Sequence, residues 1–224
     1  MIYPIGDENV QGGSFPMISY SFIGLNIIVF LIEASLDQTT LENFILTFGA
    51  IPSEITRFQD IFTLFTSMFL HGGWMHLIGN MLFLWIFADN IEATIGSFKF
   101  TIFYILGGII AALAHIVLNV DSNIPMVGAS GAISAILGSY LVMYPTSRIR
   151  VIFLLFFFAP FYLPAFAFLG IWIVEQLVSG MGSLAVQTAD TAGVAWWAHI
   201  GGFVFGVLAG FYFRQTHNTK YALA

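Results

Sequence analysis

Three short motifs hold side chains that could do chemistry in an otherwise apolar chain. The first lies within residues 71–80 and has two histidines and an asparagine, the second centres on Ser130, and the third begins at His199. There is no cysteine, which excludes thiolate metal sites and a cysteine nucleophile. A serine hydroxyl is a weak nucleophile unless a neighbouring base takes its proton, and imidazole is the commonest such base. Ser130 and His199 are therefore the candidate reactive pair, provided that the fold brings them together.

The segments that must position these residues have the composition of a membrane protein. Of the 224 residues, 58% are hydrophobic and 8% are charged, which is too few charges to cover the surface of a water-soluble domain. The net charge of −6, without a run of Lys or Arg, excludes the basic surface that nucleic-acid binding requires. We therefore expect the lipid bilayer, and no nucleic acid, as a partner of this chain.

Six apolar runs are long enough to cross a bilayer, whose hydrocarbon layer of ~30 Å needs about 20 helical residues. They are residues 18–35, 75–95, 98–119, 126–144, 151–179 and 192–214. Because each backbone polar group in lipid must be satisfied within its own segment, the runs are predicted to be helices rather than strands. The predicted fold class is an all-α membrane protein, with a six-helix core over residues 18–214 and short tails at 1–17 and 215–224.

The basic residues predict the orientation of this bundle. An even number of spans places both termini on one side, and Lys and Arg accumulate on the cytoplasmic side. Only Arg57 falls on the side away from the termini, whereas the other basic residues fall on the side of the termini: Lys99, Arg148, Arg150, Arg214 and Lys220. We therefore expect cytoplasmic termini and a long external segment over residues 37–74. The motifs would then open to the outer face, and we expect that membrane to be a bacterial plasma membrane.

A stripe of small residues predicts which helices pack together. Gly202, Gly206 and Gly210 recur every four residues after His199, a spacing that lets two membrane helices approach closely. The fourth span also carries several glycines, so we expect it to be the partner of the sixth. Close packing of these two helices would bring Ser130 within reach of His199.

The motifs, in their order along six spans, resemble those of the rhomboid intramembrane serine proteases. The residues that carry the resemblance are His71-xxxx-His76-xxx-Asn80, Gly128-Ala-Ser130-Gly131 and Ala198-His199-xx-Gly202-xxx-Gly206. The resemblance extends over about residues 18–214 and implies a rhomboid-like bundle. It also implies a Ser–His dyad, with Ser130 as nucleophile and His199 as general base, that cleaves transmembrane protein substrates without a cofactor.

The same resemblance implies an oxyanion site made of the Ser130 backbone N–H and the side chains of His76 and Asn80. This agrees with the chemistry of the residues, because a donor at developing negative charge is worth roughly 3–4 kcal/mol and an N–H in the first turn of a helix is unpaired. His76 and Asn80 are four residues apart, so they share one helix face. His71 and Gly128 are expected to support this site.

Three features leave details of the site open. Ser134 stands where many relatives have an aromatic residue that stacks on the catalytic histidine, so the sequence does not show how His199 is held. Asp190 is expected in a loop, which favours a dyad over a triad. Pro160 and Pro164 predict a break in the fifth span, the element often described as a lateral gate in the family that the chain resembles, although a kink for packing explains them equally well.

Two other interpretations remain. A rhomboid-like protein that binds membrane clients without cutting them would share the fold, although such relatives typically lack the serine or the histidine and both are present here. A metal-dependent protein or ion transporter could use the histidines. However, His71 and His76 on one helix would diverge by about 140°, and the chain has no His-Glu-xx-His pair of the kind found in zinc hydrolases. We expect no metal.

Overall fold

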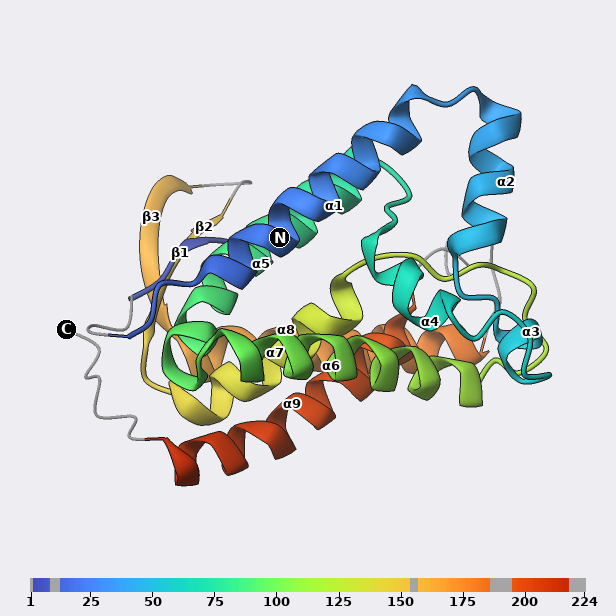
Figure 1. Cartoon of the computed structure of the whole chain (residues 1–224). Coiled ribbons are helices and arrows are strands. Elements are labelled where there is room, and N and C mark those ends of the chain that lie inside the picture. Colours follow the sequence, from blue (N-terminus) through green and yellow to red (C-terminus); the bar gives the residue numbers. More distant parts are fainter. Residues whose placement is uncertain (1, 9–12, 154–156, 186–194, 218–224) are drawn as a thin grey trace.

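The computed structural model describes residues 2–8, 13–153, 157–185 and 195–217. In this part of the chain, helices dominate, and each predicted span overlaps one long helix (Figure 1). These long helices are α1 (Met17–Ser35), α5 (Trp74–Ile95), α6 (Ser97–Val117), α7 (Ser130–Met143), α8 (Ala165–Ala185) and α9 (Trp196–Thr216).

Four of these helices, α1, α6, α8 and α9, are long and apolar enough to cross a membrane. The helix α5 is 22 residues long, but polar residues such as Asn80, Asp89, Asn90 and Glu92 interrupt its apolar sequence. The helix α7 has 14 residues, which span only about 21 Å at 1.5 Å per residue. The chain is an integral membrane protein, whereas six crossings remain a prediction.

Two antiparallel strands occupy most of the segment before α8, so the prediction of a helix over 151–179 was wrong in its first half. The strand β2 (Arg148–Phe153) pairs antiparallel with β3 (Phe157–Pro164) and with β1 (Ile2–Gly6). The order in this sheet is β1-β2-β3. The all-α prediction is therefore corrected to a mostly helical fold with one small sheet, in which residues of the expected N-terminal tail form a strand.

The sequence of β2 explains why this segment is a strand. Ile149 and Val151 are fully buried, whereas the arginines that precede each of them are exposed. Such a period of two is typical of a half-buried strand. Pro160 and Pro164 both lie in β3, an edge strand, where a missing backbone N–H is tolerated. The break predicted from these prolines therefore does not lie inside the helix α8.

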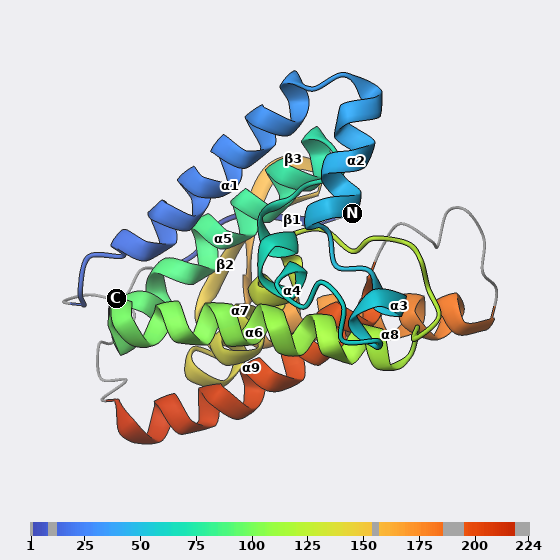
Figure 2. The same ribbon diagram turned by 45° about the vertical axis from the view of Figure 1, so that its right-hand side comes forward.

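The helix α7 lies inside the bundle. Figures 1 and 2 show it among the other long helices, and it contacts α5, α6, α8 and α9. Most of its residues are buried, including polar ones such as Ser134 and Ser139. Because these neighbours enclose it, α7 places its first residue, Ser130, inside the protein rather than in lipid.

Glu92 fixes the start of α1 against the end of α5. Its buried carboxylate accepts hydrogen bonds from the backbone N–H groups of Ile18 (2.9 Å) and Ser19 (2.7 Å) and from the Ser19 hydroxyl (2.6 Å). The hydroxyl of Ser97, in the first turn of α6, also donates to it, at 2.6 Å. A carboxylate at a helix N-terminus satisfies N–H groups that the helix leaves unpaired. Glu92 therefore has a structural role at the junction of three helices.

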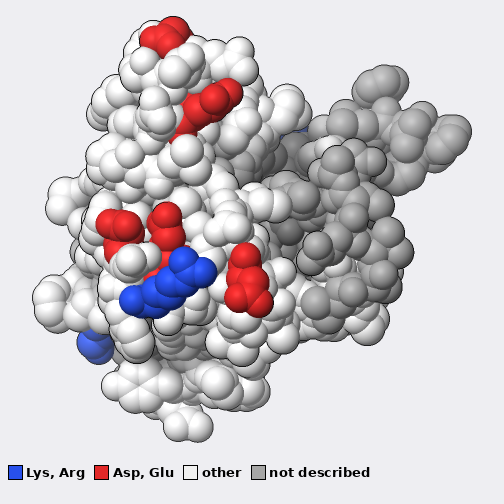
Figure 3. Space-filling model, turned by 90° about the vertical axis from the view of Figure 1, so that its right-hand side faces the viewer, with Lys and Arg blue, Asp and Glu red and all other residues white. Residues whose placement is uncertain are grey.

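The segment between α1 and α5 forms short helices at the end of the bundle opposite the sheet (Figure 1). These are α2 (Gln38–Phe48), α3 (Pro52–Ile55), α4 (Thr63–Thr66) and the 3-10 helix η1 (Ser67–Phe69). Figure 3 faces this end, where a few acidic and basic side chains lie on a mostly uncharged surface. The strand β1 and the end of α9 lie at the other end of the molecule.

Candidate active site

The helices α7 and α9 pack with almost no space between their backbones. A Cβ atom on Gly202 of α9 would overlap the carbonyl oxygen of Gly131 in α7, and one on Gly138 of α7 would overlap that of Phe203 in α9. Close approach of this kind requires glycine, because any other residue would push the helices apart. The predicted packing of the glycine stripe against the fourth span is confirmed.

This packing brings Ser130 and His199 together. Ser130 begins α7, and His199 lies in the first turn of α9. The distance between Nε2 of His199 and Oγ of Ser130 is 2.8 Å, although 69 residues separate them in the sequence. A hydroxyl at this distance from an unprotonated imidazole nitrogen can pass its proton to that nitrogen as it attacks an electrophile.

His76 and Asn80 lie beside the loop that leads into α7. Gly128 in this loop has a φ of +124°, and a Cβ atom on it would lie 2.8 Å from Nε2 of His76 and 3.5 Å from Nδ2 of Asn80. The backbone N–H of Gly72 lies 3.3 Å from Nδ1 of His76 and donates to it, which leaves Nε2 of the neutral ring as an N–H donor. Among the described residues, Nδ2 of Asn80 is buried without a hydrogen-bond partner. Both side-chain donors, Nε2 of His76 and Nδ2 of Asn80, therefore lie next to the backbone of Gly128.

His71 precedes α5 instead of lying on it, because the helix begins at Trp74, after two glycines. The prediction that His71 and His76 would diverge on one helix was therefore wrong, and their ring centroids are 5.1 Å apart. His71 is buried, and its backbone N–H donates to the buried carboxylate of Glu33 in α1 at 3.2 Å. The structure thus places the ring of His71 beside that of His76.

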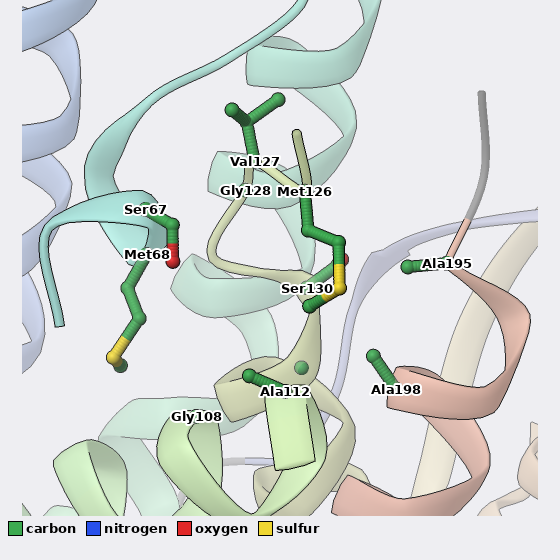
Figure 4. Close-up of a pocket in the computed structure, with 11 residues that line it drawn as sticks. Ser67, Met68, Gly108, Ala112, Met126, Val127, Gly128, Ser130, Ala195 and Ala198 are labelled. Carbon is green, nitrogen blue, oxygen red and sulfur yellow. The ribbon is translucent and has the colours of Figure 1, made fainter. Parts of the chain in front are cut away.

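A cavity of about 30 Å³ opens beside Ser130 (Figure 4). This volume is sufficient for a water molecule. In the close-up, the cavity lies between the segment of Ser67 and Met68, the loop at Gly128 and the helix that carries Ala198. The remaining lining residues are Gly108, Ala112, Met126, Val127, Ser130, Gly131 and Ala195. Ser130 therefore lines a space that is large enough for a water molecule.

Three side chains around His199 were not identified from the sequence. The amide oxygen Oε1 of Gln176 in α8 lies 2.7 Å from Nδ1 of His199. The ring centroids of Trp172 and Trp196 each lie 6.1 Å from that of His199. The only signal for Gln176 in the sequence is that it interrupts an apolar helix. These three side chains hold the imidazole of His199. Ser134, at the position where an aromatic residue was expected to stack, does not hold it, because its hydroxyl donates to the Ser130 carbonyl oxygen at 2.6 Å.

Neither a metal cluster nor a carboxylate partner for His199 appears in the part of the chain that the structure describes. No group of three His, Cys, Asp or Glu side chains there could hold a metal ion. Asp190, considered above as a third member of a triad, lies outside the described residues. The described polar side chains near Ser130 include the imidazole of His199 and the hydroxyls of Ser67 and Ser134.

A comparison with protein families identifies the chain. The Rhomboid domain matches residues 59–216, which is more than half of the sequence. The chain belongs to the rhomboid family. The matched region contains every residue discussed above as part of the rhomboid site, including Ser130, His199, His76 and Asn80.

Curated relatives of this rhomboid come from bacteria, mitochondria and plants. Rhomboid protease GluP of Bacillus subtilis (strain 168) is 32% identical over 196 residues, which are 87% of this chain and 34% of that protein. The human presenilin-associated rhomboid-like protein, mitochondrial, is 31% identical over 150 residues, 63% of this chain and 35% of that protein. RHOMBOID-like protein 5 of Arabidopsis thaliana is 28% identical over 93 residues, 42% of this chain and 30% of that protein. The chain spans about a third of the length of these relatives.

Proposed function

We propose that this rhomboid is an intramembrane serine endopeptidase with a Ser–His dyad. Oγ of Ser130 attacks the carbonyl carbon of a substrate peptide bond while Nε2 of His199 takes its proton, and His199 then protonates the leaving amine nitrogen. In the second half of the reaction His199 takes a proton from a water molecule, which attacks the carbonyl carbon of the acyl-enzyme. His199 then returns this proton to Oγ of Ser130 as the acyl group leaves. The observation that carries the proposal is the 2.8 Å distance between Oγ of Ser130 and Nε2 of His199.

The proposed oxyanion site consists of the Ser130 backbone N–H and the side chains of His76 and Asn80. Ser130 is the first residue of α7, so its N–H has no partner within the helix and lies at the positive end of the helix dipole. Nδ2 of Asn80 is buried without a partner among the described groups, and an oxyanion would supply the missing acceptor. His71 supports this site through its ring contact with His76, and Gly128 leaves the space that both donors need.

The proposed substrates are transmembrane segments of other proteins. Water enters a site of this kind from the aqueous side, and the cavity beside Ser130 has room for it. A helical substrate hides its carbonyl groups in its own hydrogen bonds, so we expect cleavage where residues that weaken a helix let it unwind. The name of the bacterial relative, a rhomboid protease, supports a proteolytic activity.

We propose that the site opens to the outer face of a bacterial plasma membrane. Lys99 lies in the first turn of α6, Arg148 and Arg150 lie in β2, and Arg214 lies in the last turn of α9. These parts of the three elements are on the same side of the molecule as β1 (Figure 1). An excess of basic residues marks the cytoplasmic side. Under this proposal both termini are cytoplasmic, and the end with α2, α3 and α4 is external.

The test is labelling and cleavage by the purified full-length protein in lipid. A fluorescent fluorophosphonate reacts with activated serines, so the wild-type protein should be labelled and should cleave a model transmembrane substrate. Ser130→Ala and His199→Ala should each lose both activities while they keep the wild-type helical content and melting temperature. Labelling and cleavage that persist in Ser130→Ala would remove the assignment.

The same assay separates the two other interpretations. A rhomboid-like protein that only binds membrane clients would retain the substrate in a pull-down but neither cleave it nor react with the fluorophosphonate. A metal-dependent enzyme would lose its activity in EDTA and regain it with zinc, whereas we expect a chelator to leave the rate unchanged.

A further inference from the structure

We propose that Gln176 is a positioning residue that holds His199 in the tautomer needed for general-base catalysis, an inference that rests on the proposed function. Gln176 comes from α8 and His199 from α9. Oε1 of Gln176 lies 2.7 Å from Nδ1 of His199, and the glutamine is only 5% exposed. The two ring nitrogens of His199 therefore both have protein partners, Gln176 on one side and Ser130 on the other.

The chemistry of the two nitrogens determines what this contact does. A neutral imidazole carries hydrogen on one nitrogen and a lone pair on the other. If the amide oxygen of Gln176 accepts the hydrogen of Nδ1, the lone pair of His199 must lie on Nε2, where the Ser130 hydroxyl can donate to it. With the hydrogen on Nε2 instead, Ser130 would have no base. The partner of Nδ1 thus selects the active tautomer.

The contact also remains available during the reaction. When Nε2 takes the proton of Ser130, the ring becomes an imidazolium in which both nitrogens carry hydrogen. The Nδ1–H group can keep donating to Oε1 of Gln176, so the amide stabilises the charged ring without itself changing protonation. A hydrogen bond in which one partner is charged is roughly twice as strong as a neutral one. Gln176 would therefore contribute more in the transition state than in the resting enzyme.

The placement of Gln176 is unusual for a residue that only fills space. An amide buried in an apolar helix is costly unless it forms hydrogen bonds, and the oxygen of Gln176 contacts Nδ1 of His199. Trp172 is four residues earlier and therefore on the same face of α8. Its ring also lies beside His199, at a tilt of 36°. One face of α8 thus orients the imidazole by packing and by a hydrogen bond.

The test compares variants of nearly equal size that differ in the acceptor. Gln176→Met keeps the length of the side chain but removes the oxygen, and we expect kcat to fall about 10- to 100-fold, a fraction of what a general base contributes. KM should change by less than about threefold, because in the proposed role Gln176 acts through His199 and not on the substrate. Gln176→Glu keeps an oxygen acceptor and should restore kcat to within about tenfold of the wild-type value. The rate constant of fluorophosphonate labelling should follow kcat.

A second position on α8 controls for general loosening of the helix. Leu169 is fully buried in α8, and Leu169→Met should leave kcat within about twofold of the wild-type value. If Gln176→Met proves too unstable to purify, Gln176→Asn provides the same test, since it keeps the amide but withdraws it by one methylene. Its labelling rate constant, measured in intact membranes, should also fall at least tenfold.

The outcomes distinguish this inference from the proposed function. A Gln176→Met enzyme with wild-type kcat, or a Gln176→Glu enzyme as slow as Gln176→Met, would overturn the positioning role. An equal loss in Leu169→Met would also overturn it, because the effect would then be packing of α8. Cleavage that requires Ser130 but not Gln176 would leave the protease assignment intact, whereas persistent cleavage by Ser130→Ala would remove that assignment itself.

Discussion

Gly206 of α9 lies directly against the backbone of Ala135 in α7, and a Cβ atom on this glycine would overlap the Ala135 carbonyl group. The contact lies about two helical turns from the point where Ser130 meets His199. Backbone contact of this kind fixes both the separation and the rotation of the two helices. The dyad distance is therefore a consequence of glycine packing as much as of the reactive residues themselves.

Gly206→Ala should consequently reduce both stability and activity. An added methyl group in a closely packed interface costs about 1–3 kcal/mol, and the forced separation of α7 and α9 should move His199 away from Ser130. We expect a melting temperature several degrees lower and a cleavage rate at least tenfold lower. Both are measured on the purified protein in one detergent.

Gly170→Ala is the matched control for this prediction. Gly170 lies in α8, and nothing lies within 4 Å of a Cβ atom built on it. Because alanine favours a helix over glycine by up to ~1 kcal/mol, this variant should be as stable as the wild type or slightly more so. A Gly206→Ala protein that behaves like Gly170→Ala would show that α7 and α9 tolerate separation.

Gly128→Ala should damage the proposed oxyanion site without unfolding the protein. The φ of +124° at Gly128 disfavours any residue with a side chain, and a Cβ atom there would lie 2.8 Å from Nε2 of His76. We expect His76 to be displaced and the cleavage rate to fall at least tenfold. Gly24→Ala, on α1 with open space around its Cβ position, should leave the rate unchanged. Full activity of Gly128→Ala would mean that His76 does not contribute to the site.

Asn80→Ala should lower the cleavage rate by roughly 10²-fold or less. Removal of one oxyanion donor costs about 10²–10³ in kcat in a serine protease, and here His76 and the Ser130 N–H would remain. The effect should appear in kcat rather than KM, because the oxyanion forms only after attack. Wild-type kinetics would indicate that Asn80 does not face the oxyanion.

The pH dependence of stability should reveal the attachment of the N-terminal segment. The carboxylate of Asp7 accepts hydrogen bonds from the Tyr140 hydroxyl and from the Asn90 amide at 2.7 Å. Burial, together with the smaller effect of the nearby carboxylate of Asp89, raises the pKa of Asp7 from 3.8 to about 7, although the hydrogen bond from Tyr140 acts in the opposite direction. The folded state therefore binds the proton more tightly than the unfolded state. This contribution to stability is complete below about pH 4 and is lost as the pH rises through 7.

We therefore expect the melting temperature of the wild type to fall between pH 5.5 and 8, and Asp7→Asn to weaken this fall, because an amide stays neutral. Glu8→Gln is the matched control. Hydrogen bonds from the backbone N–H and side chain of Arg148 lower the pKa of Glu8 below 4.5, so this carboxylate does not titrate in the window and its loss should not change the slope. A wild-type melting temperature that rises with pH would contradict the prediction.

Much of the positioning of this site follows from local features of the sequence. The membrane class, the long helices and the glycine contact between α7 and α9 depend on composition and on the spacing of neighbouring residues, which a single sequence displays directly. Ser130 and His199 could be identified because each lies in a distinctive local motif. The sheet was missed although Ile149 and Val151 alternate with arginines, because the apolar run that follows masks this short pattern.

Only the tertiary structure determined which distant side chains meet. Three contacts depend on the rotation and docking of separate elements. Gln176 contacts Nδ1 of His199, and the carboxylate of Glu33 accepts a hydrogen bond from the backbone N–H of His71. The carboxylate of Asp7 accepts one from the Tyr140 hydroxyl. No local pattern records these angles, because they result from the packing of the whole bundle. The sequence by itself determined the kind of protein and its candidate reactive pair, and the packing of the helices decided how that pair is held.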